Sequence, residues 1–454
     1  MKRFLRVAAL VLAASAPIAS AMDPAEVDKA VAALAGSTSD KDATAAVVRV
    51  VRETGGDPKL RAHLEEKLVG LLEADATTYE GRVRACQALW VVGGERALGV
   101  LERMLADERD SHLACYAIGR LPSAHAGQAL ARGLGLAKGR AAVNILNTLG
   151  SRAEAGQVDA IAKRVRDPDE AVVDAALAAL AKIGTQAAYG PIVQVRAGMK
   201  GDARRRADLA LMEWAERATA MGNVDSARKL YAVLMRPEND ALVRRGAVAG
   251  LVALPGPEWQ KVLADVMQGN EPELAKSAIA AAIRAHRAGA AEWLGGHPNL
   301  PAELAVAFVE GYGQAARTDQ EKAAGRSAAR AVGASGDTAV RLAVIGLLAR
   351  IGDESDVPQI LGYMDGTAGV DLAPPGRAAL VALGGGAKTD AALVAAMEAA
   401  PPARRVALFK VLADRFATSA APALLRQAMA AEPEVAQAAA EALGAVEPPA
   451  DLPA

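Results

Sequence analysis

Cysteines, aromatic residues and an excess of charge of either sign are all scarce in this 454-residue chain. It has two cysteines, 3% aromatic residues, and 52 Lys and Arg against 53 Asp and Glu. So few cysteines exclude a disulfide-dense scaffold. The net charge of -1 argues against nucleic acid as a partner, because phosphate neutralisation needs clustered Lys and Arg. A content of 52% hydrophobic and 23% charged residues excludes a disordered chain and a multi-span membrane protein.

The motifs that signal common chemistry are missing as well. The sequence has no Cys-x-x-Cys, no His-Glu-x-x-His, no Gly-x-x-x-x-Gly-Lys phosphate loop and no Gly-x-Ser-x-Gly. We therefore expect no catalytic residue, no cofactor and no metal, and the chain is predicted not to be an enzyme.

The first residues predict export. Three basic residues precede an apolar stretch at 7–14, and Ala19-Ser20-Ala21 has the small-x-small pattern of a cleavage site. An uncleaved anchor is the alternative, but the run is shorter than the roughly 20 residues that a span needs. Residues 1–21 are therefore predicted to be a signal peptide, and the protein to be periplasmic or secreted without a membrane span.

A phrase of small and aliphatic residues that ends in Gly or Pro returns about every thirty residues, or at multiples of that step. Apolar residues at spacings of three and four in each copy predict an amphipathic helix. A short helix pair cannot bury its apolar face alone, so neighbouring pairs must stack into a continuous core. The clearest copies end at Gly93, Pro122, Gly184, Gly352, Gly384 and Gly444.

One copy shows the physics of the pattern. Asp167-Pro168 predicts the start of a helix, and Leu180 and Ile183 are predicted to be core residues. Gly184 is predicted to end the helix, because left-handed backbone costs Gly almost nothing. The chain can then turn at once into a second helix.

Residues 201–238 depart from this pattern. Gly222 lies five residues before Ala227, which lies four before Tyr231, and this spacing resembles a tetratricopeptide hairpin. Ala218 stands where that motif usually carries Tyr, so the segment is only tetratricopeptide-like.

Two stretches carry the repeat pattern almost throughout: Asp167-Pro168 to Ile192, and Ile351-Gly352-Asp353 to Leu361. They resemble HEAT repeats of the short bacterial kind, also called PBS-lyase-type repeats. With the stretch at 111–118 and the later hairpin, the order of parts resembles secreted HEAT proteins of planctomycete and verrucomicrobial type. The resemblance implies an all-α, right-handed α-α superhelix, a HEAT/armadillo-like solenoid, whose surface binds another protein.

Some HEAT-repeat proteins are enzymes, and the resemblance raises that alternative. Hydroxylase members hold two irons with His-Glu dyads, but none of the five histidines here is followed by Glu. Bilin attachment, the PBS-lyase activity, has no residue signature in this chain. The prediction is a non-catalytic exported scaffold that binds a protein partner on its concave face. An accessory subunit of a secreted carbohydrate-degrading or redox enzyme is the alternative.

The concave face is expected to be lined by the second helix of each repeat, and the partner to engage residues 79–200. His112 and Tyr116 lie one helical turn apart on one face, where they either contact a partner or pack between repeats. The candidate partner-binding residues are Arg103, His112, Tyr116, Gln128, Arg132, Lys163 and Arg164.

The two cysteines, Cys86 and Cys115, occupy equivalent positions in neighbouring repeats. Equivalent positions on packed helices lie about 8–10 Å apart, beyond disulfide reach, so buried thiols are favoured over a bridge. The predicted organisation is a signal peptide at 1–21, capping helices at 22–78, HEAT-like repeats at 79–200, the hairpin at 201–238, further repeats at 239–445 and a disordered tail at 446–454.

Overall fold

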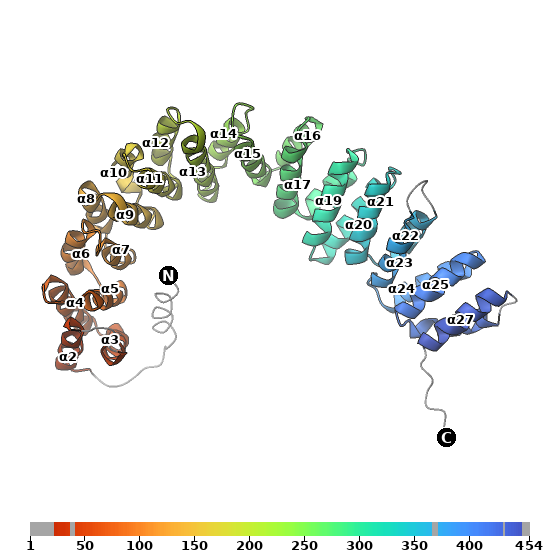
Figure 1. Ribbon diagram of the computed structural model, residues 1–454, viewed down its shortest axis with the longest axis horizontal. Helices are drawn as coiled ribbons and strands as arrows, with labels where there is room; N and C mark the ends of the chain where they lie inside the picture. Colours follow the sequence, from red (N-terminus) through yellow and green to blue (C-terminus); the bar gives the residue numbers. More distant parts are fainter. Residues whose placement is uncertain (1–21, 37–40, 366–370, 430–431, 447–454) are drawn as a thin grey trace, which may run out of the picture. The chain divides into compact units, whose positions relative to one another are not determined.

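Every regular element that the computed structural model describes is a helix (Figure 1). The description covers residues 22–36, 41–365, 371–429 and 432–446. The predicted signal peptide and residues 447–454 of the predicted tail lie outside it. Within the described residues, no helix is long and apolar enough to cross a membrane. The predicted all-α class is confirmed.

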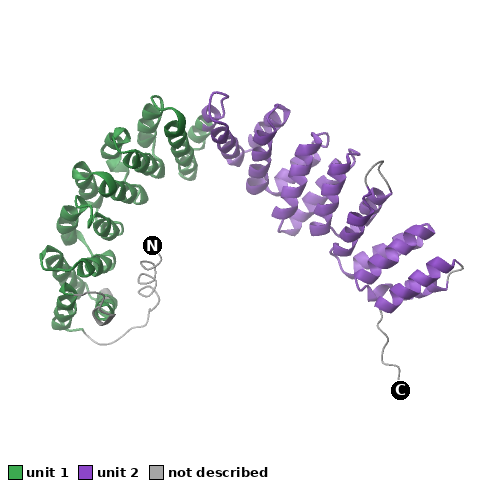
Figure 2. Ribbon diagram, viewed as in Figure 1, with its two compact units in different colours: residues 1–230 green, residues 231–454 purple. Residues whose placement is uncertain are grey.

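The chain divides into two compact units, residues 1–230 and 231–454, and the division falls within α14 (Val224–Leu234) (Figure 2). In each unit the helices alternate between two rows, and successive first helices pack side by side. Short 3-10 turns join several pairs. This is a HEAT/armadillo-like solenoid, as predicted.

Unit 1 consists of two helical rows with different positions in its arc. Figure 1 shows one row on the inner side of the arc and the other on the outer side. The inner row contains α3 (Lys41–Glu53), α5 (Tyr79–Val92), α7 (Ser111–Ile118), α9 (Gly139–Ser151), α11 (Glu170–Ile183) and α13 (Gly201–Ala220). The outer row contains α2 (Pro24–Ala35), α4 (Pro58–Glu73), α6 (Leu98–Leu105), α8 (Ala126–Leu136), α10 (Val158–Ala162) and α12 (Gln186–Arg196). The 3-10 turns of this unit are η1 (Thr54–Gly56), η2 (Glu95–Ala97), η3 (Ala155–Gln157) and η4 (Lys163–Arg166).

This arrangement corrects the expectation that the second helix of each repeat lines the concave face. The first helices, which carry the recurrent phrase, form the inner row. The physical reason is side-chain size, because small residues let helices approach closely. Ala142 and Ala176 are fully buried in the inner row, and a Cβ on Gly150 would lie 2.8 Å from the Cα of Ala179.

The copy around α11 shows how one repeat is built. Asp169 caps the helix and accepts a hydrogen bond from Ala171 N at 2.9 Å, so the helix starts just after the Asp-Pro pair. Gly184 ends it in left-handed backbone with φ of +68°. Leu180 is 0% exposed and Ile183 is 2% exposed, which confirms both as core residues.

Glycine at the end of two other copies has a different cause. Gly93 and Gly352 have φ of -61° and -74°, values open to any residue. A Cβ on Gly93 would lie 2.6 Å from Leu121 Cδ2, and one on Gly352 would lie 2.6 Å from Leu383 Cδ2. The same Cβ atoms would lie 2.5 Å from Leu89 O and closer still to Leu348 O, so the last turn of the helix and the next repeat together exclude a side chain at both positions.

Unit 2 repeats the scheme around one continuous apolar core that extends from Val248 to Val446. The row of first helices contains α15 (Ala241–Ala253), α17 (Pro272–His286), α19 (Ala302–Ala315), α21 (Thr338–Ile351), α23 (Ala373–Ala382), α25 (Pro402–Asp414) and α27 (Pro433–Val446). The other row contains α16 (Trp259–Gln268), α18 (Ala288–Gly295), α20 (Asp319–Gly333), α22 (Val357–Met364), α24 (Ala387–Glu398) and α26 (Ala421–Ala428). Its 3-10 turns are η5 (Glu354–Asp356) and η6 (Thr418–Ala420).

Arginines from adjacent elements close the C-terminal ends of several first helices. Arg61 donates to Val92 O at 3.0 Å, and Arg152 donates to Ile118 O at 2.9 Å. In unit 2, Arg415 reaches three carbonyl oxygens at the end of α23 at 2.8–3.0 Å. Because the last carbonyls of a helix lack intrahelical donors and carry partial negative charge, these cations stabilise the helix ends and join successive repeats.

Candidate partner-binding surface

The predicted partner-binding residues fall into two sets. His112 and Tyr116 lie on α7, in the inner row of unit 1. The other five lie on the outer row: Arg103 on α6, Gln128 and Arg132 on α8, and Lys163 and Arg164 in η4. The prediction therefore combined residues from opposite sides of unit 1, because it assigned the second helices to the concave face.

Two outer-row arginines pair with the preceding outer helix. Arg103 contacts Glu73 at 2.5 Å, and Arg132 contacts Glu102 through two hydrogen bonds at 2.6 and 2.7 Å. The hydrogen bond from Arg132 also holds the pKa of the Glu102 carboxyl below its ordinary value. Both arginines thus link neighbouring repeats.

The remaining outer-row candidates differ in burial. Arg164 is partly buried, donates to Ala137 O and pairs with Asp167 at 3.3 Å. Gln128 and Lys163 are exposed. Arg164 therefore stabilises the repeat junction, and the structure brings neither exposed residue into a cluster with the inner-row pair.

The inner-row candidates each contact an aromatic residue of α5. His112 Nε2 and Tyr79 Oη are hydrogen-bonded at 3.2 Å, and Arg109 lies 5.0 Å from the centroid of the Tyr79 ring. The Tyr116 ring stacks on Trp90, with centroids 5.7 Å apart and an interplanar angle of 16°. Both side chains are partly buried, so packing between repeats and exposure on the inner face coexist.

Trp90 is not among the sequence-predicted candidates. The other three tryptophans, Trp214, Trp259 and Trp293, are core residues, which are 2%, 6% and 6% exposed. Trp90 is only partly buried and lies beneath the guanidinium of Arg120, 4.9 Å from its ring centroid. Its position one helical turn after the buried Cys86 puts it at the margin of the apolar stripe of α5, which was the available signal.

An apolar depression adjoins this stack on the inner row. It is formed by α3, α5 and the Tyr116 side chain of α7, and its lining residues are Thr44, Val47, Val48, Val51, Arg84, Gln87, Ala88, Trp90, Val91 and Tyr116. Arg84 pairs with Glu80 at 2.6 Å and donates to Gln87 Oε1 at 3.1 Å. The depression therefore combines an aliphatic floor, two aromatic rings and a polar rim, the composition typical of ligand-binding hollows.

The two thiols are buried and unbridged, as the sequence favoured. Burial raises the pKa of Cys115 to about 12, and burial likewise raises the pKa of Cys86 far above its ordinary value. Both thiols are therefore inert packing groups in the α5–α7 core.

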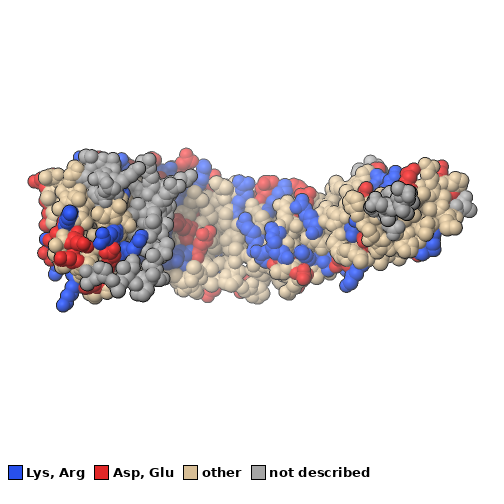
Figure 3. Space-filling model, turned by 90° about the horizontal axis from the view of Figure 1, so that it is seen from below, with Lys and Arg blue, Asp and Glu red and all other residues tan. Residues whose placement is uncertain are grey.

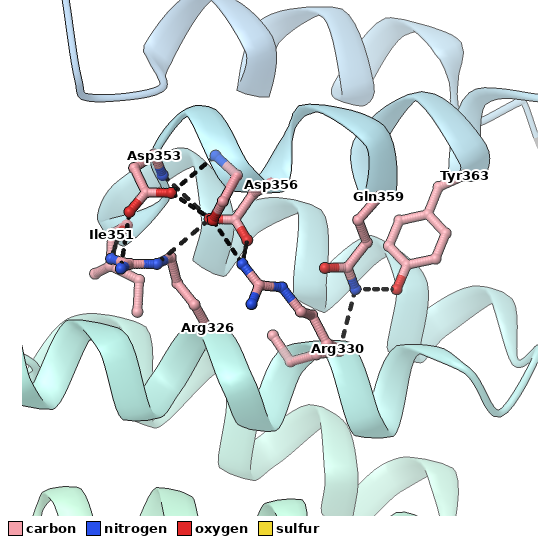
Figure 4. Close-up of polar contacts among 9 residues, drawn as sticks. Arg326, Arg330, Ile351, Asp353, Asp356, Gln359 and Tyr363 are labelled. Carbon is pink, nitrogen blue, oxygen red and sulfur yellow. Dashed lines mark hydrogen bonds and ion pairs between the residues drawn. The ribbon is translucent and has the colours of Figure 1, made fainter. Parts of the chain in front are cut away.

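A cluster of carboxylates and guanidiniums lies in unit 2 at η5 (Figure 4). Asp356 is fully buried and accepts from Arg330 at 2.8 Å and from Asp353 N at 3.1 Å, and Arg326 pairs with Asp353 at 2.8 Å. Two carboxylates and two guanidiniums neutralise one another. The cluster fixes α20 against η5 and leaves neither carboxylate free to act on a ligand.

Lys and Arg side chains also gather over the first helices of unit 2 in Figure 3, with acidic side chains among them. Ion pairs account for several of these charges: Arg244 with Glu271 at 2.6 Å, and Lys276 with Glu303 at 2.5 Å. Because carboxylates compensate these cations, the surface differs from the uniform basic stripe of a nucleic-acid interface.

A wider hollow lies between α19 and α21. Small residues such as Gly313 and Gly346 line it, together with the exposed Leu342 and one charge of each sign, Glu310 and Arg350. It contains no aromatic ring. Among the described residues, no group of three or more His, Cys, Asp or Glu could hold a metal ion.

No family model and no curated protein matches the sequence. Among solved structures, the chain is similar to the karyopherin Kap121p bound to the extreme C-terminus of the protein phosphatase Cdc14p, with 11% identity, a TM-score of 0.44, and coverage of 90% of this chain and 56% of that one. For importin beta the identity is 12%, the TM-score 0.42 and the coverage 98% and 70%. For a designed armadillo repeat protein the values are 19%, 0.24, 56% and 98%. The chain thus spans little more than half of the Kap121p chain, and likeness at these levels concerns the helical-repeat fold alone.

Proposed function

We propose that this chain is a non-catalytic, exported scaffold that binds a protein partner on the inner row of unit 1. The observation that carries the proposal is the stack of Trp90, Tyr116 and Arg120 beside an apolar depression. Trp, Tyr and Arg dominate the binding energy of protein interfaces when they surround a pocket that excludes water. The resemblance to short, PBS-lyase-type HEAT repeats of secreted proteins supports the same function.

The partner-binding part is tested by affinity capture with the full chain and an envelope extract of the organism that produces it. Trp90→Ala and Tyr116→Ala should each greatly reduce capture of the partner. Arg103→Ala and Arg132→Ala are matched controls, because they remove exposed side chains from the outer row of the same unit. The proposed surface is wrong if the outer-row variants abolish capture while the inner-row variants retain it.

Export is tested separately by sequencing the N-terminus of the purified protein from its native host. The sequence Ala19-Ser20-Ala21 supports cleavage before Met22, which should then be the first residue. A protein that still begins with Met1 or Lys2 contradicts the signal peptide, and this result leaves the partner-binding proposal standing.

A further inference from the structure

The surroundings of Trp90 define what the inner-row site recognises. In a chain with only four tryptophans, this is the one whose ring stays partly open among the described residues. Tyr116 stacks on it and Arg120 covers it, which holds the indole in place. A rigid, partly exposed aromatic ring loses little entropy when a partner packs against it, so it is suited to anchor an incoming side chain.

The adjoining depression is too small to enclose a side chain, but it offers an apolar surface beside the ring. Val47 and Val51 of α3 form its floor and are 5% and 4% exposed, and Val48 and Val91 extend the apolar lining. No carboxylate is among the lining residues. An aliphatic or aromatic side chain of a partner that packs over this lining and against Trp90 therefore desolvates no lining carboxylate.

The charges around the depression favour an acidic partner. Glu80 compensates Arg84, but the buried Nε of Arg84 has no hydrogen-bond acceptor. Arg120 is exposed, and so is Arg52, which lies one helical turn beyond Val48 on α3. Within the part of the chain that the structure describes, neither Arg120 nor Arg52 has a carboxylate partner. The rim thus carries uncompensated positive charge.

We infer that this site binds a peptide segment in which an Asp or Glu lies next to an aromatic or large aliphatic residue. The apolar side chain packs against Trp90 over the depression, and the carboxylate pairs with Arg120. This inference rests on the proposed function and specifies the chemistry of the partner. Charge-assisted hydrogen bonds from guanidinium to carboxylate supply the specificity, because they are stronger and more directional than neutral ones.

The test uses the full chain as bait for a random peptide library displayed on phage. The enriched peptides should carry Asp or Glu beside an aromatic or large aliphatic residue, and Trp90→Ala bait should not enrich them. The Arg120→Gln variant should weaken the best peptide by about tenfold or more, as expected for a lost hydrogen bond to a charged group. Binding of the best peptide to the wild-type protein should also weaken as the salt concentration is raised.

Arg103→Gln is the matched control, because it removes an exposed guanidinium from the outer row and should leave peptide affinity unchanged. Helix content and thermal midpoint, measured for every variant, separate lost binding from lost folding, and Trp90→Tyr provides a ring-preserving second variant. Enrichment of neutral or basic peptides, or enrichment that survives Trp90→Ala, overturns the inference.

The two proposals fail in different ways. If the selected peptides lack acidic residues but Trp90→Ala still abolishes capture of the native partner, the inferred chemistry is wrong and the proposed function stands. If capture of the native partner is insensitive to Trp90→Ala and Tyr116→Ala, the proposed surface itself is wrong.

Discussion

Each unit stacks a tryptophan on another ring, and the two settings have opposite consequences. In unit 2, Trp259 stacks on His286 with centroids 4.3 Å apart, and His286 Nε2 donates to Val252 O at 2.6 Å. The tryptophan is 6% exposed and the histidine is committed to the backbone of the preceding repeat. In unit 1, Trp90 stacks on Tyr116 but remains partly open, and its neighbour Arg120 is exposed.

The difference shows that ring stacking alone does not identify a binding site. The Trp259 pair contributes by burial, and His286 Nε2 is used within the fold. The Trp90 pair keeps accessible ring surface and an uncompensated cation beside an apolar depression. Exposure and unsatisfied charge, rather than aromatic contact, distinguish a surface available to a partner from a packed core.

The largest expected effect is the loss of stability when Trp259 of unit 2 is replaced. Trp259→Ala should lower the free energy of unfolding by about 3–5 kcal/mol, because it removes a large buried side chain and leaves a cavity. Trp90→Ala should cost about 1 kcal/mol, as for a partly exposed position. Urea denaturation of both variants measures the contrast, and equal losses would mean that Trp90 is a core residue and not an open anchor.

A substitution in the core of unit 1 tests whether the different stability losses of Trp259→Ala and Trp90→Ala reflect burial or a general difference between the two units. Leu180→Ala should cost about 2–5 kcal/mol, since Leu180 is 0% exposed. Because repeats couple mainly to their neighbours, the loss should appear first around α11 and its adjacent helices. Hydrogen exchange along the chain shows which helices lose protection. Uniform loosening of the whole chain would contradict nearest-neighbour coupling.

Glycines that end the recurrent phrase should respond alike in the two units wherever the next repeat crowds them. Gly93→Ala and Gly352→Ala should each cost about 1–3 kcal/mol, because the added Cβ meets a carbonyl oxygen of the preceding helix turn and a leucine of the next repeat. Gly444→Ala is the control, because a Cβ there meets nothing within 4 Å. Thermal denaturation compares the three variants. A loss for Gly444→Ala as large as the other two would show that crowding is not the cause.

The repeat architecture could be predicted because it depends on local signals. Apolar residues at helical spacing located Leu180 and Ile183 in the core, and Gly184 at the end of its helix. The identity of the inner row could not be predicted in the same way. It depends on how closely neighbouring helices approach, as at Gly150 and Ala179, and a single helix pattern does not contain that distance.

The candidate site could be predicted only in part. His112 and Tyr116 were found because their spacing places them on one helical face, whereas Trp90 was not among the candidates. The Tyr116 and Arg120 side chains that contact its ring belong to the next repeat, more than twenty residues along the chain, so the pattern of a single helix does not contain them. The ion pair of Arg103 with Glu73 likewise lies beyond sequence reasoning, because the two residues are thirty positions apart on neighbouring outer helices.

The smallest expected effect is that of an outer-row substitution in unit 1, in contrast to the inner-row substitutions. Arg132→Ala should barely change stability at neutral pH, because exposed ion pairs contribute little, and should leave partner capture intact.

The hydrogen bond from Arg132 lowers the pKa of Glu102. The stabilisation of the folded state by the Arg132–Glu102 pair is therefore complete above the pKa of Glu102 in the unfolded chain. It is lost as the pH falls through the lower pKa of Glu102 in the folded state. Thermal midpoints of wild type and Arg132→Ala should accordingly converge on acidification. A gap that widens in acid would show that Glu102 gains nothing from this pair, and loss of partner capture by Arg132→Ala would return the binding surface to the outer row.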